Sequence, residues 1–272
     1  MLVVANSVFT IHLLSLPAMS LQSQLDHYYE LYNRSDFIEH DPILLPHRFT
    51  KKEDIEIIAF FVALIAWGQR ISIIRSGEKL IQLFHNAPHD FILHHTDKDL
   101  KACQSFVHRT FNGDDLLSLI AYLKALYQSG EGLEKAFSKH LKRTDTTVEA
   151  ALIGFRRAFQ NSEVALSRTL KHIATPEKGS ACKRLNMYLR WMVRKDDKGV
   201  DFGIWKSIKA SQLVCPLDVH VIRQAGELGL ISNSKGDWKT ALELTQNLKV
   251  FDPKDPVKYD FALFGKGVSE SL

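Results

Sequence analysis

Hydrophobic and polar positions follow a helical period along most of the chain. Segments in which apolar residues recur every three or four positions predict amphipathic helices. These segments are Ser20–Leu31, Ile71–His85, Asp97–Phe106, Asp114–Gln128, Gly132–Leu141, Thr147–Phe159, Glu177–Arg194, Asp218–Leu228 and Trp238–Leu248. Runs of alternating β-branched residues, which would indicate strands, are scarce. The pattern therefore predicts an all-α protein of roughly ten helices.

Two further segments differ from this pattern. Ile55–Trp67 is apolar nearly all round, which predicts a buried central helix. The residues TKKE at positions 50–53 have a capping-box pattern, and Gly68 is typical of a helix end. Asp36–Phe49 contains two prolines and has irregular polarity, so it is expected to be an extended surface segment.

The composition is that of an ordinary globular protein. Of the 272 residues, 45% are hydrophobic and 24% are charged, which excludes disordered and fibrous classes. The formal net charge of +4 is too small by itself to indicate a nucleic-acid partner. The basic residues are unevenly placed, however, because the segment from Lys178 to Lys195 holds six Lys or Arg and no Asp or Glu. This segment is either a solvated helix face or a surface that binds a polyanion.

The three cysteines, Cys103, Cys182 and Cys215, are odd in number and far apart. Neither a disulfide framework nor a cysteine zinc site is therefore expected, and a reducing cytoplasm is the favoured location. Residues 1–18 are apolar, but they carry no Lys or Arg before their hydrophobic run and are too broken to span a bilayer. Two interpretations of them stay open: a native segment, or an extension ahead of a true start at Met19.

Asp218 is the candidate catalytic carboxylate. Pro216 forces the residue before it to be extended, and Asp218 then occupies the N-cap of the next predicted helix. The apolar approach over residues 213–217 would leave this carboxylate partly removed from water. Asp218 is thus either a simple helix cap or a desolvated reactive group. His220 and Arg223, on the first turn of the same helix, could orient it or contact phosphate.

Lys183 is the candidate nucleophile, 35 residues before Asp218 on the basic helix predicted at Glu177–Arg194. Leu185 and Leu189 turn one face of that helix toward the core, so Lys183 is expected to be only partly exposed. A lysine that is partly removed from water near other cations has a lowered pKa, which suits an imine-forming nucleophile. The alternative is an ordinary surface lysine. The arginines of this helix are expected to be free to contact phosphates: Arg184, Arg190 and Arg194.

Three short elements of the chain resemble those of one known superfamily. A segment of the form Pro-x-Asp-x-His-x-x-Arg is matched by Pro216, Asp218, His220 and Arg223. An element of the form Lys-x-x-x-x-x-Leu-Arg is matched by Lys183, Leu189 and Arg190. A glutamine after a buried helix, which reaches into the DNA gap, is matched by Gln69. Together they resemble the helix-hairpin-helix DNA glycosylase superfamily, the group of endonuclease III and the archaeal-type 8-oxoguanine glycosylases.

This resemblance implies a fold, an activity and a set of residues. Residues 19–272 would form one helical unit of two subdomains, with a cleft that receives a flipped, damaged base such as an oxidised purine. The chain would be a DNA N-glycosylase, with abasic-site lyase activity if Lys183 acts as the nucleophile; Lys178 is the alternative. Asp218 and Lys183 would be catalytic. The residues expected to contact DNA are Gln69, Arg70, Lys178, Arg184, His220 and Arg223. Its partner would be double-stranded DNA bearing a damaged base, bound by a monomer, with no membrane.

The chain departs from the superfamily at the hairpin, which normally reads Leu-Pro-Gly-Val-Gly ahead of the lysine. Residues 174–180 read ATPEKGS, with one glycine. Phosphate binding by hairpin N–H groups is therefore either lost or taken over by Lys178 and Arg184. The cysteine quartet of endonuclease III is missing, so neither an iron–sulfur cluster nor another cofactor is expected. Two other functions stay open: a non-catalytic nucleic-acid-binding protein of the same fold, and a helical interaction protein.

The chain as a whole also resembles a bacterial family that brings no activity with it, through DFIEHDPILLPHRF, RTFNGDD, DFGIWKSI and FDPKDPVKYDFALFGKG. No GxGxxG, GxxxxGK[ST], HExxH or GxSxG pattern occurs, which disfavours nucleotide-cofactor, P-loop, zincin and hydrolase chemistry. Four aromatic residues could stack on a flipped base, although core packing is the favoured interpretation of each: Trp191, Trp205, Trp238 and Phe264.

Overall fold

The computed structural model describes residues 19–269, and these are mostly helical, so the prediction of an all-α protein is confirmed. The interpretation of residues 1–18 falls outside this range. The α-helices are α1 (Leu21–Tyr32), α2 (Ser35–Glu39), α3 (Lys52–Leu64), α4 (Arg70–Leu83), α5 (Pro88–His94), α6 (Asp97–Cys103), α7 (Gly113–Gln128), α8 (Gly132–Ser138), α9 (Glu149–Gln160), α10 (Lys183–Val193), α11 (Val219–Glu227), α12 (Trp238–Phe251) and α13 (Asp260–Ser269). The 3-10 helices are η1 (Pro42–Leu44), η2 (Pro46–Arg48), η3 (Thr169–Lys171), η4 (Pro176–Lys178), η5 (Ala210–Gln212) and η6 (Pro256–Tyr259). Two short strands, β1 (Val107–His108) and β2 (Phe111–Asn112), pair antiparallel.

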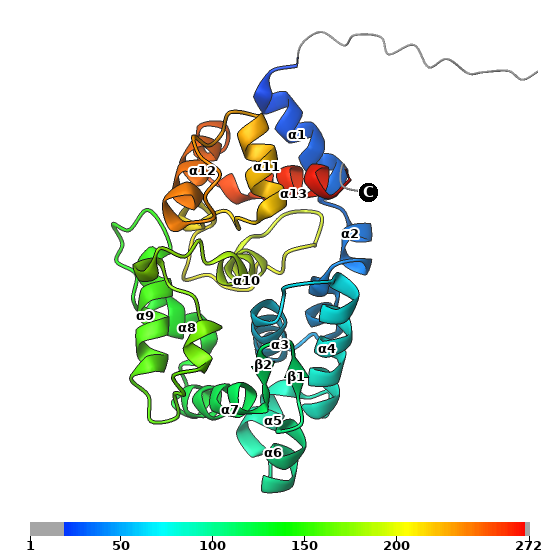
Figure 1. Ribbon diagram of the computed structural model, residues 1–272, viewed down its shortest axis with the longest axis vertical. Helices are drawn as coiled ribbons and strands as arrows, with labels where there is room; N and C mark the ends of the chain where they lie inside the picture. Colours follow the sequence, from blue (N-terminus) through cyan, green and yellow to red (C-terminus); the bar gives the residue numbers. More distant parts are fainter. Residues whose placement is uncertain (1–18, 270–272) are drawn as a thin grey trace, which may run out of the picture.

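The helices form two groups, with α10 between them (Figure 1). One group, at the top of Figure 1, consists of α1 and α11–α13, and in it α13 packs against both α1 and α11. The other consists of α3–α9 and is built around α3, which contacts α4, α5 and α8. α10 packs directly against α3. Within the described range, no helix combines the length and the apolar character needed to cross a membrane.

α3 is the central buried helix that the apolar run predicts. Every residue from Ile57 to Ile65 is 0% exposed, because a helix without a polar face must be covered on all sides. Its ends differ from the prediction. Lys51 rather than Thr50 is the N-cap and makes no side-chain cap bond, and the helix stops at Leu64. The capping-box prediction is therefore wrong.

The prediction of an extended surface segment at Asp36–Phe49 is also wrong. This segment forms α2, η1 and η2, and much of it is buried: Pro42, Ile43, Leu45 and Pro46. A proline opens each 3-10 helix, where its fixed φ is already suitable and no N–H is needed. Both short helices pack on α3, so the apolar side chains between the prolines face the core rather than water.

The basic helix is shorter than the prediction of Glu177–Arg194. Residues 176–178 instead form η4, capped by the Thr175 side chain, and α10 begins only at Lys183. Gly179, with φ +74, ends η4 in the left-handed conformation that glycine adopts without strain. Cys182, with φ +51, is the left-handed residue at which α10 starts. These two reversals separate the hairpin segment from the helix that bears the lysine.

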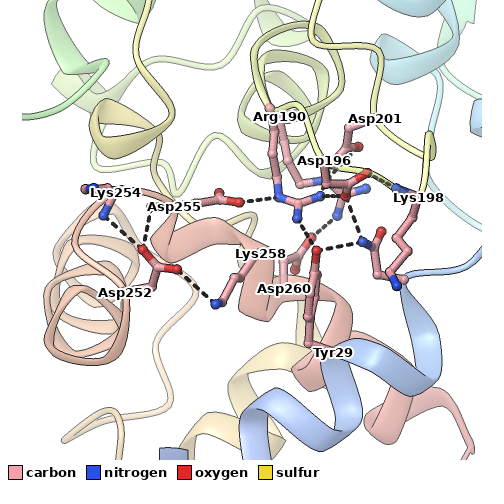
Figure 2. A network of polar contacts seen from close by, with 12 residues as sticks. Tyr29, Arg190, Asp196, Lys198, Asp201, Asp252, Lys254, Asp255, Lys258 and Asp260 are labelled. Atoms are coloured by element: carbon pink, nitrogen blue, oxygen red, sulfur yellow. Dashed lines mark hydrogen bonds and ion pairs between the residues drawn. The ribbon is translucent and has the colours of Figure 1, made fainter.

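The last turn of α10 is fixed by a buried ionic network (Figure 2). Arg190 and Arg194 are 5% and 1% exposed, so the expectation that both are free to contact phosphates is wrong. Arg190 pairs with Asp201 and with Asp260, the first residue of α13. Arg194 pairs with carboxylates on both sides: Asp196 at 2.5 Å, Asp201 at 3.0 Å and Asp255 at 2.8 Å. The network joins α10 to the connection after it and to the beginning of α13.

Candidate functional site

A cavity of about 720 Å³ lies where the two groups of helices meet α10. Its walls come from α2, η1, the loop between α3 and α4, the start of α4, α10, the Pro216–His220 segment and α13. Of the residues predicted to act in catalysis or DNA binding, five line it: Arg70, Lys183, Arg184, Asp218 and His220. The cavity thus brings Lys183 and Asp218 together, next to the loop that follows the buried helix.

Lys183 and Asp218 form an ion pair in this cavity. Nζ of Lys183 lies 3.7 Å from Oδ2 of Asp218, and the side chains are 31% and 20% exposed. The other carboxylate oxygen, Oδ1, accepts hydrogen bonds from the backbone N–H groups of His220 and Val221, both at 3.0 Å. Asp218 is therefore the N-cap of α11, as predicted, while its second oxygen faces the lysine. Holding one oxygen through the backbone fixes the position of the other.

Arg184 also lines the cavity, but its guanidinium is engaged within the protein. It donates to the backbone oxygen of Leu64 and lies 4.7 Å from the ring centre of Trp67, a cation–π contact. Burial lowers the pKa of Arg184 to about 10. Contact with a phosphate would have to use the N–H donors that these two contacts leave over.

The remaining predicted DNA contacts lie outside the cavity lining. Gln69 is exposed at the N-cap of α4, next to Arg70. Lys178 is exposed on η4, so only Lys183 of the two candidate nucleophiles reaches the cavity. Arg223 donates to the backbone oxygen of Gly267 at 2.7 Å and so joins α11 to α13.

The segment in place of the hairpin uses its backbone N–H groups internally. The N–H of Glu177 donates to the side chain of Thr175, and that of Lys178 to the backbone oxygen of the same residue. Gly179 donates to the oxygen of Pro176. These three groups are therefore not turned toward a phosphate, unlike the N–H groups of an anion-binding nest.

Two buried carboxylates at the cavity were not predicted from the sequence. Burial raises the pKa of Asp41, although the N–H of Ile43 and the charges of Arg190, Arg70 and Lys183 lower it. Burial also raises the pKa of Asp260 to about 6, Arg190 acting against this and Asp218 adding to it. The only local signal for Asp41 is its position before Pro42, where an Asp is a common cap.

The aromatic residues divide between the core and the cavity. Trp191, Trp205 and Trp238 are buried in the core, as expected. Phe264 packs against the core, in line with the favoured interpretation, and also lines the cavity, as does Trp67. The indole of Trp67 stacks on the His172 ring at 5.7 Å.

Arg109 is a further cation that the sequence did not single out. It is exposed, and an added Cβ at Gly68 would lie 2.8 Å from its Nε. Because Gly68 lines the cavity, this guanidinium stands beside the mouth. Among residues 19–269, no group of three or more His, Cys, Asp or Glu side chains is placed to hold a metal ion.

Comparison with known proteins identifies the family but not a relative. No curated protein and no solved structure matches the chain. The family described as "Protein of unknown function (DUF2400)" matches residues 41–269, which include every wall of the cavity except α2. Since this match covers most of the 272 residues, the chain belongs to the DUF2400 family.

Proposed function

We propose that the protein is a DNA N-glycosylase with abasic-site lyase activity, acting on duplex DNA that contains a damaged base. The observation that carries the proposal is the placement of Lys183 Nζ 3.7 Å from Asp218 Oδ2 at the wall of a cavity of about 720 Å³. An amine beside a carboxylate is the pair that imine-forming excision requires. An oxidised purine remains the first candidate base.

In the proposed reaction the damaged nucleotide leaves the helical stack and its base enters the cavity. The free electron pair of Lys183 Nζ, once the amine has lost its proton, attacks C1′ as the bond from C1′ to the base nitrogen breaks. The base leaves with the electrons of that bond and takes up a proton. Asp218 stabilises the positive charge that develops on the sugar, since a fixed anion acts most strongly in a site with little water. The amine-linked sugar then opens to an imine, and loss of a C2′ proton expels the 3′ phosphate.

The arrangement of helices supports the same proposal. The cavity lies between the two groups of helices, which would correspond to the two subdomains of the superfamily, with the base bound between them. Gln69, Arg70 and Arg109 lie at or beside the loop after α3, so they are the residues proposed to meet the DNA around the mouth. Lys178 and Arg223 would contribute at most to the outer DNA surface.

Borohydride trapping on a duplex with a single abasic site tests the proposal. Borohydride reduces the imine to a stable amine, so the wild-type protein is expected to form a covalent adduct with the DNA. Lys183→Ala is expected to abolish this adduct. Lys178→Ala is the matched control, because Lys178 lies on the same basic segment but is exposed and outside the cavity. No adduct with the wild-type protein removes the lyase activity, and an undiminished adduct with Lys183→Ala removes Lys183 as the nucleophile.

The internal use of the N–H groups at residues 177–179 favours one alternative, a non-catalytic nucleic-acid-binding protein of the same fold. This alternative predicts salt-dependent DNA binding without release of any base. Asp218→Asn separates the two functions. In a glycosylase the wild-type protein releases the base and the variant does not. In a non-catalytic protein neither releases a base, and the variant only leaves DNA binding equal or stronger because a negative charge is removed.

A further inference from the structure

One face of α4 is exposed and carries two cations. The opposite face is buried and holds Ile73, Gly77, Leu80 and Ile81. Arg75 and Lys79 are both exposed, and because they are four residues apart they lie one above the other on the helix. The helix itself begins at Arg70, which lines the cavity. The exposed face therefore leads away from the mouth of the cavity along α4.

The β1–β2 hairpin lies beside the same helix. Nδ1 of His108 is 2.8 Å from Oγ of Ser76, in the middle of α4. Nζ of Lys79 is 5.9 Å from the ring centre of Phe106, which comes just before β1. As the chain runs forward through residues 106–108 it thus passes back along α4 toward the first turn of that helix.

Arg109 is in the turn of the hairpin and reaches the loop at the mouth. His108 pairs with Phe111, so the turn consists of Arg109 and Thr110. Arg109 has φ +54, in the left-handed region that glycine and asparagine adopt more readily. Gly68 has φ +93, and an added Cβ there would lie 2.8 Å from Nε of Arg109. A side chain at position 68 would therefore displace this guanidinium.

The three cations of this surface have no acidic partner. Among residues 19–269, Arg75, Lys79 and Arg109 form no ion pair. The one acid in the sequence of α4, Glu78, is paired with Arg48 at 2.8 Å instead. Positive charges that are not compensated within the protein attract a polyanion, and the planar donors of arginine suit phosphate in particular.

We infer that Arg75, Lys79 and Arg109 form a phosphate track, along which the duplex next to the flipped nucleotide lies on α4. This inference rests on the proposed function for the nucleotide being bound in the cavity. Duplex DNA is favoured over another polyanion because the track starts at the mouth, where Arg70 belongs both to α4 and to the cavity wall.

The dimensions of α4 agree with this placement. From Arg70 to Lys79 the helix rises about 14 Å, a length over which one strand of duplex DNA carries about four phosphates. Three contacts to that strand are therefore possible. The track also supplies a grip on the DNA that the segment in place of the hairpin does not, since the N–H groups of residues 177–179 are used internally.

Fluorescence anisotropy of the full chain on a duplex with one abasic site, measured at several salt concentrations, tests the track. Each phosphate contact that is lost lowers the slope of log association constant against log salt by about 1. Arg75→Gln/Lys79→Gln should therefore lower the slope by about 2, and the further change Arg109→Asn by about 1 more. Glutamine keeps the helix propensity, and asparagine tolerates the left-handed turn.

Lys235→Gln/Lys239→Gln is the matched control. These two lysines are also exposed and four residues apart, at the beginning of α12. They lie next to the segment in place of the hairpin, because the N–H of Trp238 donates to the oxygen of Gly179 at 3.0 Å. The control should keep the wild-type slope. An unchanged slope in Arg75→Gln/Lys79→Gln, which leaves the hairpin intact, overturns the inference, and so does an equal loss in the control.

Duplexes that end beside the abasic site on one side or the other show whether the cations bind DNA in register with the cavity. Because the track leads to one side of the mouth, removing that flank should abolish the difference in affinity between the wild-type protein and Arg75→Gln/Lys79→Gln. Removing the other flank should leave the difference in place. A difference that survives on both shortened duplexes indicates attraction of any polyanion and overturns the inference.

Borohydride trapping on the same abasic duplex tests the proposed function separately, because it reports on the amine and not on the flanking DNA. Trapping by the wild-type protein, together with an unchanged salt slope in the track variants, removes only the phosphate track. A slope that depends on Arg75 and Lys79 without any trapping keeps the track and removes only the lyase.

Discussion

Asp218 uses its two carboxylate oxygens separately, with Oδ1 on the first N–H groups of α11 and Oδ2 3.7 Å from the amine of Lys183. The cap and the ion pair can therefore be changed independently. A residue that keeps the cap but loses the charge shows what the charge does without disturbing the helix.

For the glycosylase proposed above, Asp218→Asn is expected to abolish base release with little loss of stability. Asparagine caps a helix as well as aspartate, so the melting temperature should stay within about 1 °C. Base release should fall at least about 100-fold, because the fixed anion is gone. Asp218→Ala loses both the cap bonds and the charge, so its free energy of unfolding should also fall by about 1 kcal/mol. Base release assays and thermal melts of the two variants check this, and equal activity of Asp218→Asn and wild type would contradict it.

Arg190→Met is expected to destabilise the protein by about 3–5 kcal/mol, since it leaves Asp260 buried without a cation and Asp201 with Arg194 as its remaining partner. Adding Asp260→Asn should recover part of this loss. Chemical denaturation of the single and double variants measures the recovery. Arg34→Met is the control, because the Arg34–Asp36 pair is exposed and should contribute less than about 1 kcal/mol. Equal losses in Arg190→Met and Arg34→Met would refute the role of the buried network.

Gly77→Ala is expected to destabilise α4 although alanine is the better helix former. An added Cβ would lie 2.2 Å from Cδ1 of Leu45, so the close approach of α4 to η1 would be lost. Gly226→Ala in α11 is the matched control, since nothing lies within 4 Å of its added Cβ. That variant should gain about 0.5–1 kcal/mol. The prediction is that the free energy of unfolding, measured by denaturation, falls in Gly77→Ala and rises in Gly226→Ala.

The buried ring of His172 makes stability depend on pH. Burial lowers its pKa to about 4, with Asp115 acting against this, while the unfolded chain has the ordinary value of 6.5. Between pH 6.5 and 4 the unfolded state therefore binds more protons, and stability is lost as the pH falls through this range, by up to about 3 kcal/mol. In His172→Gln, the part of the dependence of the free energy of unfolding on pH that comes from this ring should disappear.

The exposed His94 is the control for that measurement, with His94→Gln expected to keep the wild-type slope. Free energies of unfolding at several pH values between 4 and 7 give the comparison. Since other groups titrate in the same range, including Asp260, the quantity to compare is the difference between variant and wild type. An unchanged slope in His172→Gln would show that the ring is not the source.

Features that depend on a few neighbouring residues were predictable from the sequence. The start of α11 is one, since the restraint from Pro216 and the cap bonds of Asp218 act within six residues. The apolar run at residues 55–67 is another, because a helix without a polar face has to be buried. The meeting of Lys183 with Asp218 was expected only from the resemblance, and its geometry needed the fold.

Features that depend on distant partners were not predictable. Arg190 meets Asp260, which is 70 residues away, so its helix position gave no sign of burial. Asp41 lines the cavity on a segment whose Leu45 packs where Gly77 leaves room on α4, 32 residues further along the chain. The prolines around it are as common on surfaces as in such buried turns, so the local pattern could not separate the two.

The packing of α13 on α1 sets the order in which the protein can become functional during synthesis. α13 supplies Asp260 and Phe264 to the cavity and is the last helix described in chain order. Contacts between distant parts of a chain form late, because the intervening residues must first be ordered. A nascent chain would thus carry Lys183 and Asp218 before the cavity around them is closed, and this ion pair would gain its full surroundings only after the ribosome has made residues 260–269.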